Sequence, residues 1–480
     1  MVFSSLTFLW IFLPSVLLVN YLFSFIKKEN VKFLCKNINL FVASLVFYAW
    51  GGLTYLCVML ASILGNYLFA LWINNAKTRE VPSNKSAKCA LIFALIFNLG
   101  LLFYFKYTNF FVNIIESIAH ANFGLREVVL PIGISFFTFQ AMSYVIDVYR
   151  EKVACQKNFL LLALYISLFP QLIAGPIVKY QDIENQLHNR QESVDNFVVG
   201  IKRFLYGLAK KVIIANTCGQ VAEVVFGSSI SELGTGAAWL GLICYTIQIY
   251  FDFSGYSDMS IGLGKMFGFN FSENFNYPYT SLSITEFWRR WHISLSAWFK
   301  EYVYIPLGGN RKGMARTLLN LFVVFLLTGI WHGANYTFIL WGVFYGVIIV
   351  LERLFFKKWL DKNKIKPLNW LYTMLVVMLL WVFFRADSVG YAFAFIGKLF
   401  DFSKGNVNVP GLIDLWGWTV LVFGIVFCGF AQRLLEKPYN NLKAKTWVFW
   451  LDSAIQFCLL FVCIVLLMNN SFNPFIYFQF

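Results

Sequence analysis

Long apolar runs separated by short polar stretches follow one another along almost the whole chain. Residues 6–26, 53–73 and 447–468 are typical of them, and a run of about 20 apolar residues is long enough to cross a bilayer as an α-helix. The strict alternation of apolar and polar positions that predicts a transmembrane β-barrel is not seen in the sequence. The pattern therefore predicts an all-α polytopic membrane protein with roughly eleven spans or half-spans.

Composition and charge agree with this interpretation. Of the 480 residues, 59% are hydrophobic and 13% are charged, whereas a soluble domain has roughly 25% charged residues, so no large soluble domain is expected. Lys and Arg gather between apolar runs, for example at residues 27–36 and 353–366, and the net charge is +15. Such loops are typically cytoplasmic, which places both ends of the chain outside. We expect membrane lipid as the surroundings and no nucleic-acid partner.

Three further features narrow the class of protein. The first apolar run has no basic residue before it and no small-residue cleavage site after it, so we expect a retained span and not a signal peptide. The nine cysteines are scattered without a Cys-x-x-Cys pair, which indicates neither a metal nor a redox centre. No internal repeat is visible, and this argues against a transporter built from inverted repeats.

Three apolar segments carry features that a helix surrounded by lipid would not tolerate. Residues 131–148 contain a series of polar side chains, and residues 158–174 end in a break rich in Pro and Gly. The run at residues 237–253 continues into a stretch with Asp252 and Asp258. Polar or broken helices occur at membrane depth where they pack on protein or line a cavity. We therefore expect these segments to surround a polar network or a tunnel.

Residues 285–332 contain two of the four histidines of the chain. His332 lies in a Trp-His-Gly motif at the bend between two apolar runs, and His292 ends a charged aromatic stretch. In a single helix through this stretch, Trp288, Trp291 and His292 share one face. Burying an imidazole without a partner is costly, and an ionisable residue within a membrane segment is a functional candidate. A histidine held in the core for structural reasons is the alternative for both positions.

The order of the motifs resembles the membrane-bound O-acyltransferase (MBOAT) family, and within it the branch of alginate and peptidoglycan O-acetyltransferase membrane subunits. The matching motifs extend almost from one end of the chain to the other. They occupy residues 1–5, 131–137, 175–177, 250–258, 287–292, 331–333, 381–387 and 474–478, and they include YFDFSGYSD, FWRRWH and WHG. Each motif is weak alone, but their order in a polytopic chain is highly specific.

The resemblance implies one integral-membrane acyltransferase domain in the inner membrane of a bacterium. The expected fold is an MBOAT-type helical bundle with re-entrant or broken helices around a central tunnel. In the family pattern, His332 is the essential catalytic histidine and His292 is the second polar position. The expected parts of the domain (residues 1–480) are N-terminal spans at 1–130, a tunnel-forming catalytic core at 131–387, and C-terminal spans and a tail at 388–480.

The implied reaction moves an acetyl group from cytoplasmic acetyl-CoA, which we expect as acyl donor and not as a permanently bound cofactor. The transfer requires a hydroxyl that attacks a thioester, and an imidazole with a pKa of about 6.5 can accept the hydroxyl proton near neutral pH. No Ser-His-Asp spacing, Gly-rich phosphate loop or metal-ligand cluster is seen in the sequence. Four cations would suit the donor phosphates, with ordinary loop charge as the alternative: Arg289, Arg290, Arg311 and Lys312.

The acceptor that the resemblance implies is an exported polysaccharide such as alginate or peptidoglycan. Because the chain has no room for an extracytoplasmic domain that could hold a glycan, we expect a separate extracytoplasmic acetyltransferase to receive the acetyl group. Tyr477, in the stretch that follows the last apolar run, is the candidate covalent carrier between the two proteins. An aromatic residue anchored at the membrane interface is the alternative for Tyr477.

A transporter or flippase of a lipid-linked or acyl precursor is the other class that the polar segments allow. Such a protein would also need a polar cavity, but it would have no need for the Trp-His-Gly motif. Consumption of acetyl-CoA, and the dependence of this consumption on His332, distinguishes the two classes.

Overall fold

The computed structural model describes residues 1–362, 365–402, 404–442, 445–469 and 472–474. These residues form α-helices with a few 3-10 and π-helical turns, which confirms the predicted all-α class. Eight of the described helices are long and apolar enough to cross a membrane, and a ninth span arises if the bent pair of Leu415–Phe427 and Phe430–Leu442 is counted. The sequence predicted roughly eleven because it counted shorter runs as spans or half-spans.

The chain divides into two compact units, which are described separately. Unit 1 comprises Met1–Phe204 and Met259–Ser272, and unit 2 comprises Leu205–Asp258 and Glu273–Phe480. Two helices, α9 (Val194–Ala209) and α11 (Thr235–Met266), contribute residues to both units.

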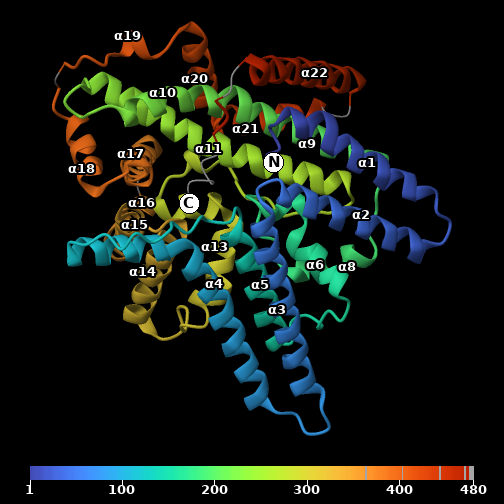
Figure 1. The fold of residues 1–480 in the computed structure, drawn as a ribbon. Helices are drawn as coiled ribbons and strands as arrows, with labels where there is room; N and C mark the ends of the chain where they lie inside the picture. Colours follow the sequence, from blue (N-terminus) through green and yellow to red (C-terminus); the bar gives the residue numbers. More distant parts are fainter. Residues whose placement is uncertain (363–364, 403, 443–444, 470–471, 475–480) are drawn as a thin grey trace. The chain divides into compact units, whose positions relative to one another are not determined.

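Unit 1 contains the N-terminal helices, coloured blue to green in Figure 1. A turn at Gly51 and Gly52 joins α2 to α3, and Gly52 adopts a φ of +135° that favours glycine. Apart from its parts of α9 and α11, the unit contains η1 (Phe8–Phe12), α1 (Leu13–Leu22), η2 (Phe23–Phe25), α2 (Glu29–Ala49), α3 (Leu53–Thr78), α4 (Asn84–Ala119), α5 (Ile134–Tyr149), α6 (Phe159–Ser167), α7 (Phe169–Leu172) and α8 (Tyr180–His188).

Two segments of unit 1 that the sequence marked as polar or broken are buried within it. Nearly every side chain of α5 is buried, including the polar residues Ser135 and Asp147. The apolar run that follows is interrupted at Leu168, between α6 and α7. Both segments pack against protein, and burial of their polar side chains away from lipid explains why the sequence tolerates them. That they surround a tunnel stays a prediction.

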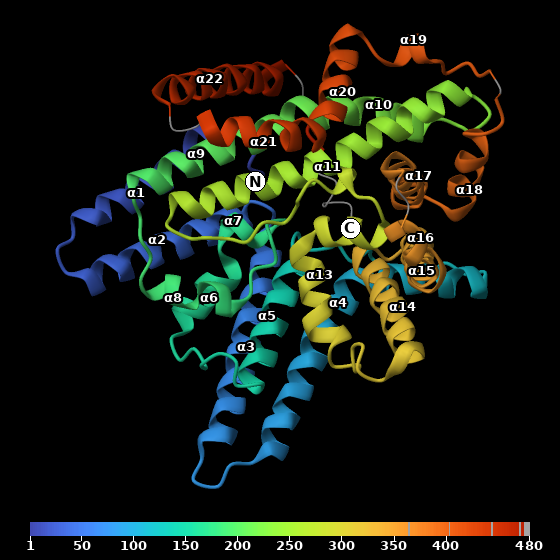
Figure 2. The same cartoon turned by 180° about the vertical axis from the view of Figure 1, so that it is seen from behind.

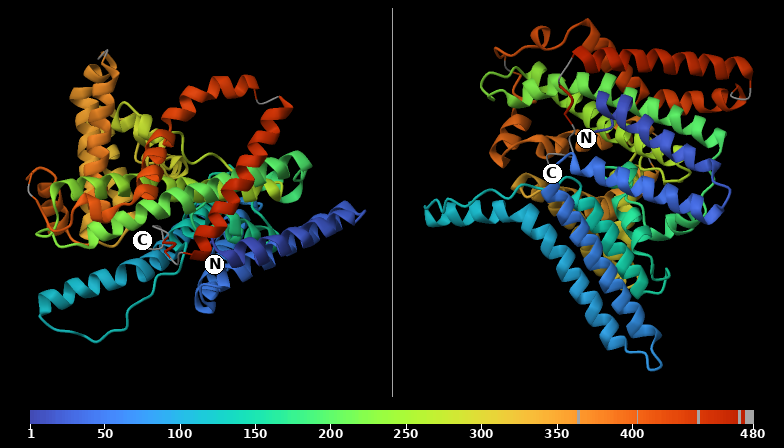
Figure 3. Two further views of the ribbon diagram at one scale, coloured as in Figure 1. Left: turned by 90° about the horizontal axis from the view of Figure 1, so that it is seen from above. Right: turned by 45° about the vertical axis from the view of Figure 1, so that its right-hand side comes forward.

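Helix α4 is one continuous helix from Asn84 to Ala119. The polar residues 106–109 within it do not stop helical hydrogen bonding. Figure 3 shows that the cyan C-terminal part of α4 nevertheless turns away from the direction of its first part.

Unit 2 contains every residue of the candidate site. Besides its parts of α9 and α11, it consists of the following elements in chain order: η3 (Lys210–Ala215), α10 (Asn216–Gly227), η4 (Pro278–Thr280), α12 (Ile284–Arg290), α13 (Ile293–Phe299), η5 (Lys300–Tyr304), α14 (Gly313–His332), α15 (Tyr336–Leu351), η6 (Glu352–Phe356), α16 (Lys357–Lys362), α17 (Lys366–Arg385), α18 (Val389–Lys398), α19 (Val409–Leu412), α20 (Leu415–Phe427), α21 (Phe430–Leu442) and α22 (Thr446–Asn469).

Helices α14 and α15 form an antiparallel hairpin with the Trp-His-Gly motif at its turn (Figure 2). Helix α14 ends at His332, and the side chain of Asn335 accepts a backbone N–H in the first turn of α15. The helices approach closely at Gly329 and Gly342, where a Cβ on Gly342 would lie 2.6 Å from the carbonyl oxygen of Phe325. Small residues permit such close packing in membrane proteins. The hairpin therefore holds His332 firmly beside α15.

Candidate active site

His332 lies at the C-terminal end of α14, buried among aromatic rings. The residue is only 3% exposed. Its ring centroid lies 5.0 Å from that of Trp331, 5.2 Å from that of Trp341 and 5.1 Å from that of Phe384. Phe384 belongs to α17, so three helices of unit 2 meet at this imidazole. A titratable ring in such apolar surroundings is a candidate for chemistry.

The stretch that contains His292 is not the single helix that the sequence predicted. Helix α12 ends at Arg290 and α13 begins at Ile293, and His292 between them has a left-handed backbone with a φ of +44°. Residues other than glycine adopt this conformation rarely. The expectation that Trp288, Trp291 and His292 share one helix face is therefore wrong, because tertiary contacts of His292 override the helical pattern.

Asn274 provides those contacts. Its Oδ1 accepts the backbone N–H of Ser294 at 3.2 Å and the Ser294 hydroxyl at 2.9 Å, and it lies 3.1 Å from Nδ1 of His292. Because a backbone N–H can only donate, Oδ1 is the acceptor, and Nδ1 of His292 carries the proton. Asn274 Nδ2 donates in turn to Ser257 of α11 at 3.1 Å. The network holds His292 as the Nδ1–H tautomer, with Nε2 as an acceptor.

Burial lowers the pKa of His292 to about 3, so the ring is neutral in the folded protein near pH 7. An unfolded histidine takes up a proton below about pH 6.5. Below about pH 6.5 and down to about pH 3, the unfolded state therefore binds more protons than the folded state. The free energy of unfolding decreases as the pH is lowered through this range, by up to about 1.4 kcal/mol per pH unit.

When the pH is lowered from about 6.5 to 5, we expect the thermal stability of His292→Gln in detergent to decrease less steeply than that of wild type. The exposed-residue control His120→Gln should keep the wild-type slope, and an unchanged slope in His292→Gln would contradict the assignment.

The two histidines flank one indole ring. The centroid of Trp331 lies 6.2 Å from that of His292 and 5.0 Å from that of His332. His292 also packs on Phe253 of α11 at 4.7 Å. The structure thus brings the two predicted histidines into one aromatic cluster, although they are far apart in the sequence.

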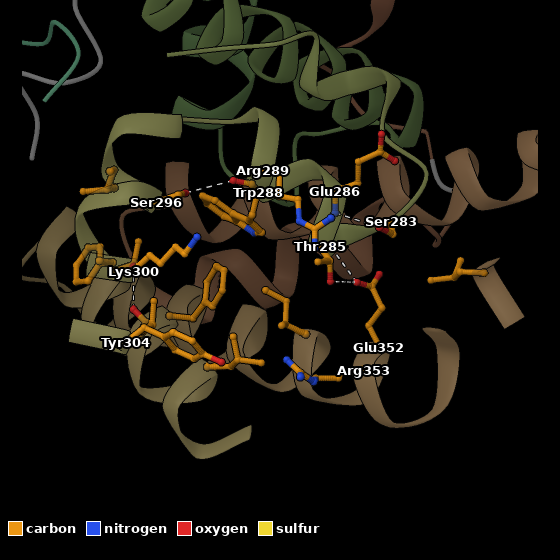
Figure 4. Close-up of a pocket in the computed structure, with 18 residues that line it drawn as sticks. Ser283, Thr285, Glu286, Trp288, Arg289, Ser296, Lys300, Tyr304, Glu352 and Arg353 are labelled. Carbon is orange, nitrogen blue, oxygen red and sulfur yellow. Dashed lines mark hydrogen bonds between the residues drawn. The ribbon is translucent and has the colours of Figure 1, made fainter. Parts of the chain in front are cut away.

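A cavity of about 550 Å³ lies beside this cluster (Figure 4). Its walls come from α12, α13, η5, α14 and the junction of α15 with η6. The lining residues of α14 run from Leu321 to Thr328 along one helix face, and Thr328 lies one turn before His332. The cavity therefore leads along α14 from the end of the hairpin at Arg353 toward the imidazole. Its size is within the usual range for small-molecule sites.

Three cations surround this cavity: Arg289 of α12, Lys300 of η5 and Arg353 of η6 (Figure 4). All three are exposed, and none has an ion-pair partner among the described residues. The lining carboxylate of Glu286 is already paired, with Arg290 at 2.7 Å. The cavity therefore offers positive charge that phosphate groups could occupy.

Glu352 fixes α12 against the cavity. Its two oxygens accept the backbone N–H groups of Ile284 and Thr285 at 2.8 Å each, and also the Thr285 hydroxyl. A carboxylate at a helix N-terminus satisfies exposed N–H groups and complements the helix dipole. Glu352 is only 2% exposed, so this contact sets the position of Trp288 and Arg289 in the next turn of α12.

The four cations that the sequence suggested for phosphate binding lie in different settings. Arg289 lines the cavity, whereas the other three are not among its lining residues. Arg290, besides its ion pair, donates to the carbonyl oxygen of Asn276 at 3.2 Å. Arg311 and Lys312 are exposed in the loop before α14. The role of all four in donor binding stays a prediction.

Several residues of the site were missed by sequence reasoning. Lys300 and Arg353 look like ordinary loop cations in the sequence, and only their places in the π-helical turns η5 and η6 distinguish them. Such turns occur frequently at functional sites. Asn274 and Glu352 belong to no motif, and their roles follow from hydrogen bonds to residues far away in the sequence.

The described end of the C-terminal tail is attached to the interior of unit 2. Lys211 of η3 forms a buried ion pair with Asp252 at 2.6 Å and donates to the carbonyl oxygen of Pro474. Asn216 Nδ2 donates to Oδ1 of Asn473 at 3.3 Å. Removing one partner of a buried ion pair is strongly destabilising, so this attachment rests on a rigid part of the unit.

The predicted carrier Tyr477 lies outside the described residues, and its role stays a prediction. Asp252, which shares Lys211 with Pro474, directly precedes Phe253, the residue that packs on His292. The described tail is therefore attached close to the helix α11 residues that support the second histidine.

A buried imidazole close to a cationic cavity, with Trp341 between it and the lining residue Trp288, suits the transfer of a group from an anionic donor. The model of MBOAT, the membrane-bound O-acyltransferase family, matches residues 155–391, a range that includes both histidines and the whole cavity. The chain belongs to the membrane-bound O-acyltransferase family. It is an acyltransferase and a multi-pass protein of the bacterial inner membrane, which confirms the resemblance seen in the motifs.

The names of its curated relatives refer to alginate and to peptidoglycan. The chain is 40% identical to "Probable alginate O-acetylase AlgI" of Pseudomonas putida, over 100% of both chains. It is 42% identical to the protein of the same name from Pseudomonas aeruginosa, over 92% of this chain and 83% of the relative. It is 34% identical to "Peptidoglycan O-acetyltransferase" of Helicobacter pylori, over 98% of this chain and 90% of the relative. These relatives indicate a membrane O-acetyltransferase.

Proposed function

We propose that this protein takes acetyl from cytoplasmic acetyl-CoA and passes it across the membrane for O-acetylation of an exported polysaccharide. The observation that carries the proposal is the cavity that runs along α14 toward His332, with three cations that have no ion-pair partner in the described part of the chain. Acetyl-CoA has phosphates at one end, which these cations suit, and a thioester at the other end, which reacts beside His332 in this proposal. The names of the relatives support alginate, peptidoglycan or a similar glycan as the final acceptor.

In the proposed reaction, His332 acts as a general base. It takes the proton of an acceptor hydroxyl while the hydroxyl oxygen attacks the thioester carbonyl carbon, so that a C–O bond forms. The intermediate then collapses, the C–S bond breaks, and the imidazolium returns the proton to the thiolate of CoA. The products are an acetyl ester and free CoA, and His332 is restored. His292 supports the aromatic cluster in its neutral form.

The first acceptor in this proposal is the phenol of Tyr477. A phenyl ester is more activated than an alkyl ester, so the acetyl group can be passed on to a hydroxyl of an extracytoplasmic partner enzyme, which regenerates the phenol. The attachment of Pro474 to Lys211 supports the proposal, because it fixes the described end of the tail beside Asp252 of α11. The partner then acetylates the glycan.

Charge reversal in the cavity tests donor binding. We expect Lys300→Glu and Arg353→Glu each to raise the KM for acetyl-CoA by about tenfold or more with little change in kcat, because each removes a charge-assisted contact to a phosphate. The measurement is CoA release by purified protein at varied acetyl-CoA concentrations.

Two controls make this experiment specific. S-acetyl-N-acetylcysteamine carries the thioester without phosphates, and its turnover should be unaffected by the same substitutions. Lys366→Glu reverses an exposed charge at the start of α17 that does not line the cavity, and it should leave the KM unchanged. An equal KM increase for both donors, or none for acetyl-CoA, would contradict phosphate binding at this place.

A further inference from the structure

Three buried hydrogen-bond donors lie in the wall between the cavity and His332. Tyr345 and Trp341 are 0% exposed and Trp288 is 7% exposed. The hydroxyl of Tyr345 and the indole N–H groups of Trp341 and Trp288 have no hydrogen-bond partner among the residues that the structure describes. An unsatisfied buried donor is destabilising, so three of them in one cluster need an explanation.

Their order in space follows the path from the cavity to the imidazole. Trp288 lines the cavity, and its ring centroid lies 5.0 Å from that of Tyr345. Tyr345 lies 5.0 Å from Trp341, one turn along α15, and Trp341 lies 5.2 Å from His332. Tyr345 is also 6.1 Å from Phe325, another residue of the cavity wall. The acyl end of a donor that extends from the cavity toward His332 therefore meets Tyr345 and Trp341 first.

We propose that the Tyr345 hydroxyl, assisted by the Trp341 indole N–H, donates a hydrogen bond to the thioester carbonyl oxygen of the acyl donor. This inference rests on the proposed function, because it requires a thioester to react beside His332. It adds a catalytic residue that belongs to none of the sequence motifs, and it explains why these donors are kept without a partner in the protein itself.

The hydrogen bond acts where negative charge develops. When the acceptor oxygen bonds to the carbonyl carbon, the π electrons of the C=O bond move to the carbonyl oxygen, and the Tyr345 O–H stabilises this oxyanion. When the C–S bond breaks, those electrons re-form the C=O bond, the thiolate takes the proton held by His332, and Tyr345 keeps its own proton throughout. A donor placed in advance in a water-poor site typically contributes about 10²–10³-fold to kcat.

Tyr345→Phe is the decisive variant because it removes one oxygen atom and keeps the ring. We expect kcat for CoA release from acetyl-CoA to fall by about 10²–10³-fold, with KM changed little. Thermal stability in detergent should be equal to that of wild type or higher, because the variant removes a buried hydroxyl that has no partner among the described residues. A purely structural tyrosine would show the opposite combination, with lower stability and unchanged kcat.

Tyr279→Phe is the matched control from the same aromatic region. Its hydroxyl donates to the carbonyl oxygen of Thr246 at 2.6 Å, so the variant should lose stability and keep kcat. Wild-type kcat in a folded Tyr345→Phe protein would overturn the inference about Tyr345, while a loss of activity in His332→Ala in the same assay would leave the proposed function standing. If His332→Ala also kept its activity, the proposed function itself would fail.

Discussion

Replacing His332 with alanine is expected to leave the helix hairpin folded and to lower acetyl transfer by about 10²–10⁴-fold, the usual contribution of a general base. The hairpin does not depend on the imidazole, because the close contact between Gly329 and Gly342 and the Asn335 cap hold its two helices together. The loss should appear in kcat, measured as CoA release by purified protein, with an unfolding midpoint in detergent close to that of wild type.

Two other histidine variants show whether the effect is specific. His292→Ala should lower the activity less than His332→Ala does, since the ring of His292 is neutral and is held by Asn274 at a kink. It should lower the thermal stability more than His332→Ala does, because it leaves the Asn274 network incomplete. His120→Ala changes an exposed residue after α4 and should change neither quantity. Wild-type activity in a well-folded His332→Ala protein would contradict the assignment of His332 as the general base.

Tyr477→Phe is expected to abolish acetylation of the glycan when the extracytoplasmic partner is present. The substitution deletes only the hydroxyl that carries the acetyl group in the proposed relay and keeps the aromatic ring that could anchor the tail. The measurement is the ester content of the exported polysaccharide in cells that carry the variant at the wild-type protein level.

The control for the relay is Tyr439→Phe, which removes the hydroxyl of an exposed tyrosine on α21 and should leave the glycan fully acetylated. Normal acetylation of the glycan in Tyr477→Phe would show that Tyr477 does not carry the acetyl group and that the tail is only an anchor. Acetylation of the polymer by the purified membrane protein without any partner would contradict the predicted second enzyme.

The features that the sequence predicted well are those set by local pattern. Apolar runs marked the long helices, and the Trp-His-Gly motif marked the end of α14. Polar residues in an apolar run, as at Asp147 of α5, correctly indicated a helix buried in protein. In each case the residues that carry the pattern also form the structure, so no distant contact is needed.

The features that the sequence did not reveal depend on distant contacts. The kink at His292 arises from hydrogen bonds to Asn274, which the helical period of the aromatic stretch does not contain. The cavity is formed by residues from Ser283 to Leu360, so its cations Lys300 and Arg353 could not be separated from other loop charges. The aromatic wall with Tyr345 likewise becomes visible only when α12 packs on α15.

In the proposed reaction, acetyl crosses the membrane while its donor stays on the cytoplasmic side. Proteoliposomes with the protein and its partner, supplied on the cytoplasmic side with acetyl-CoA labelled separately in the acetyl group and in the adenine, test this most directly. We expect the acetyl label to become bound to the partner or glycan on the other side, the adenine label to stay behind as free CoA, and His332→Ala to stop both events. Passage of both labels together, or acetyl transfer that is unchanged in His332→Ala, would rule out the proposed function.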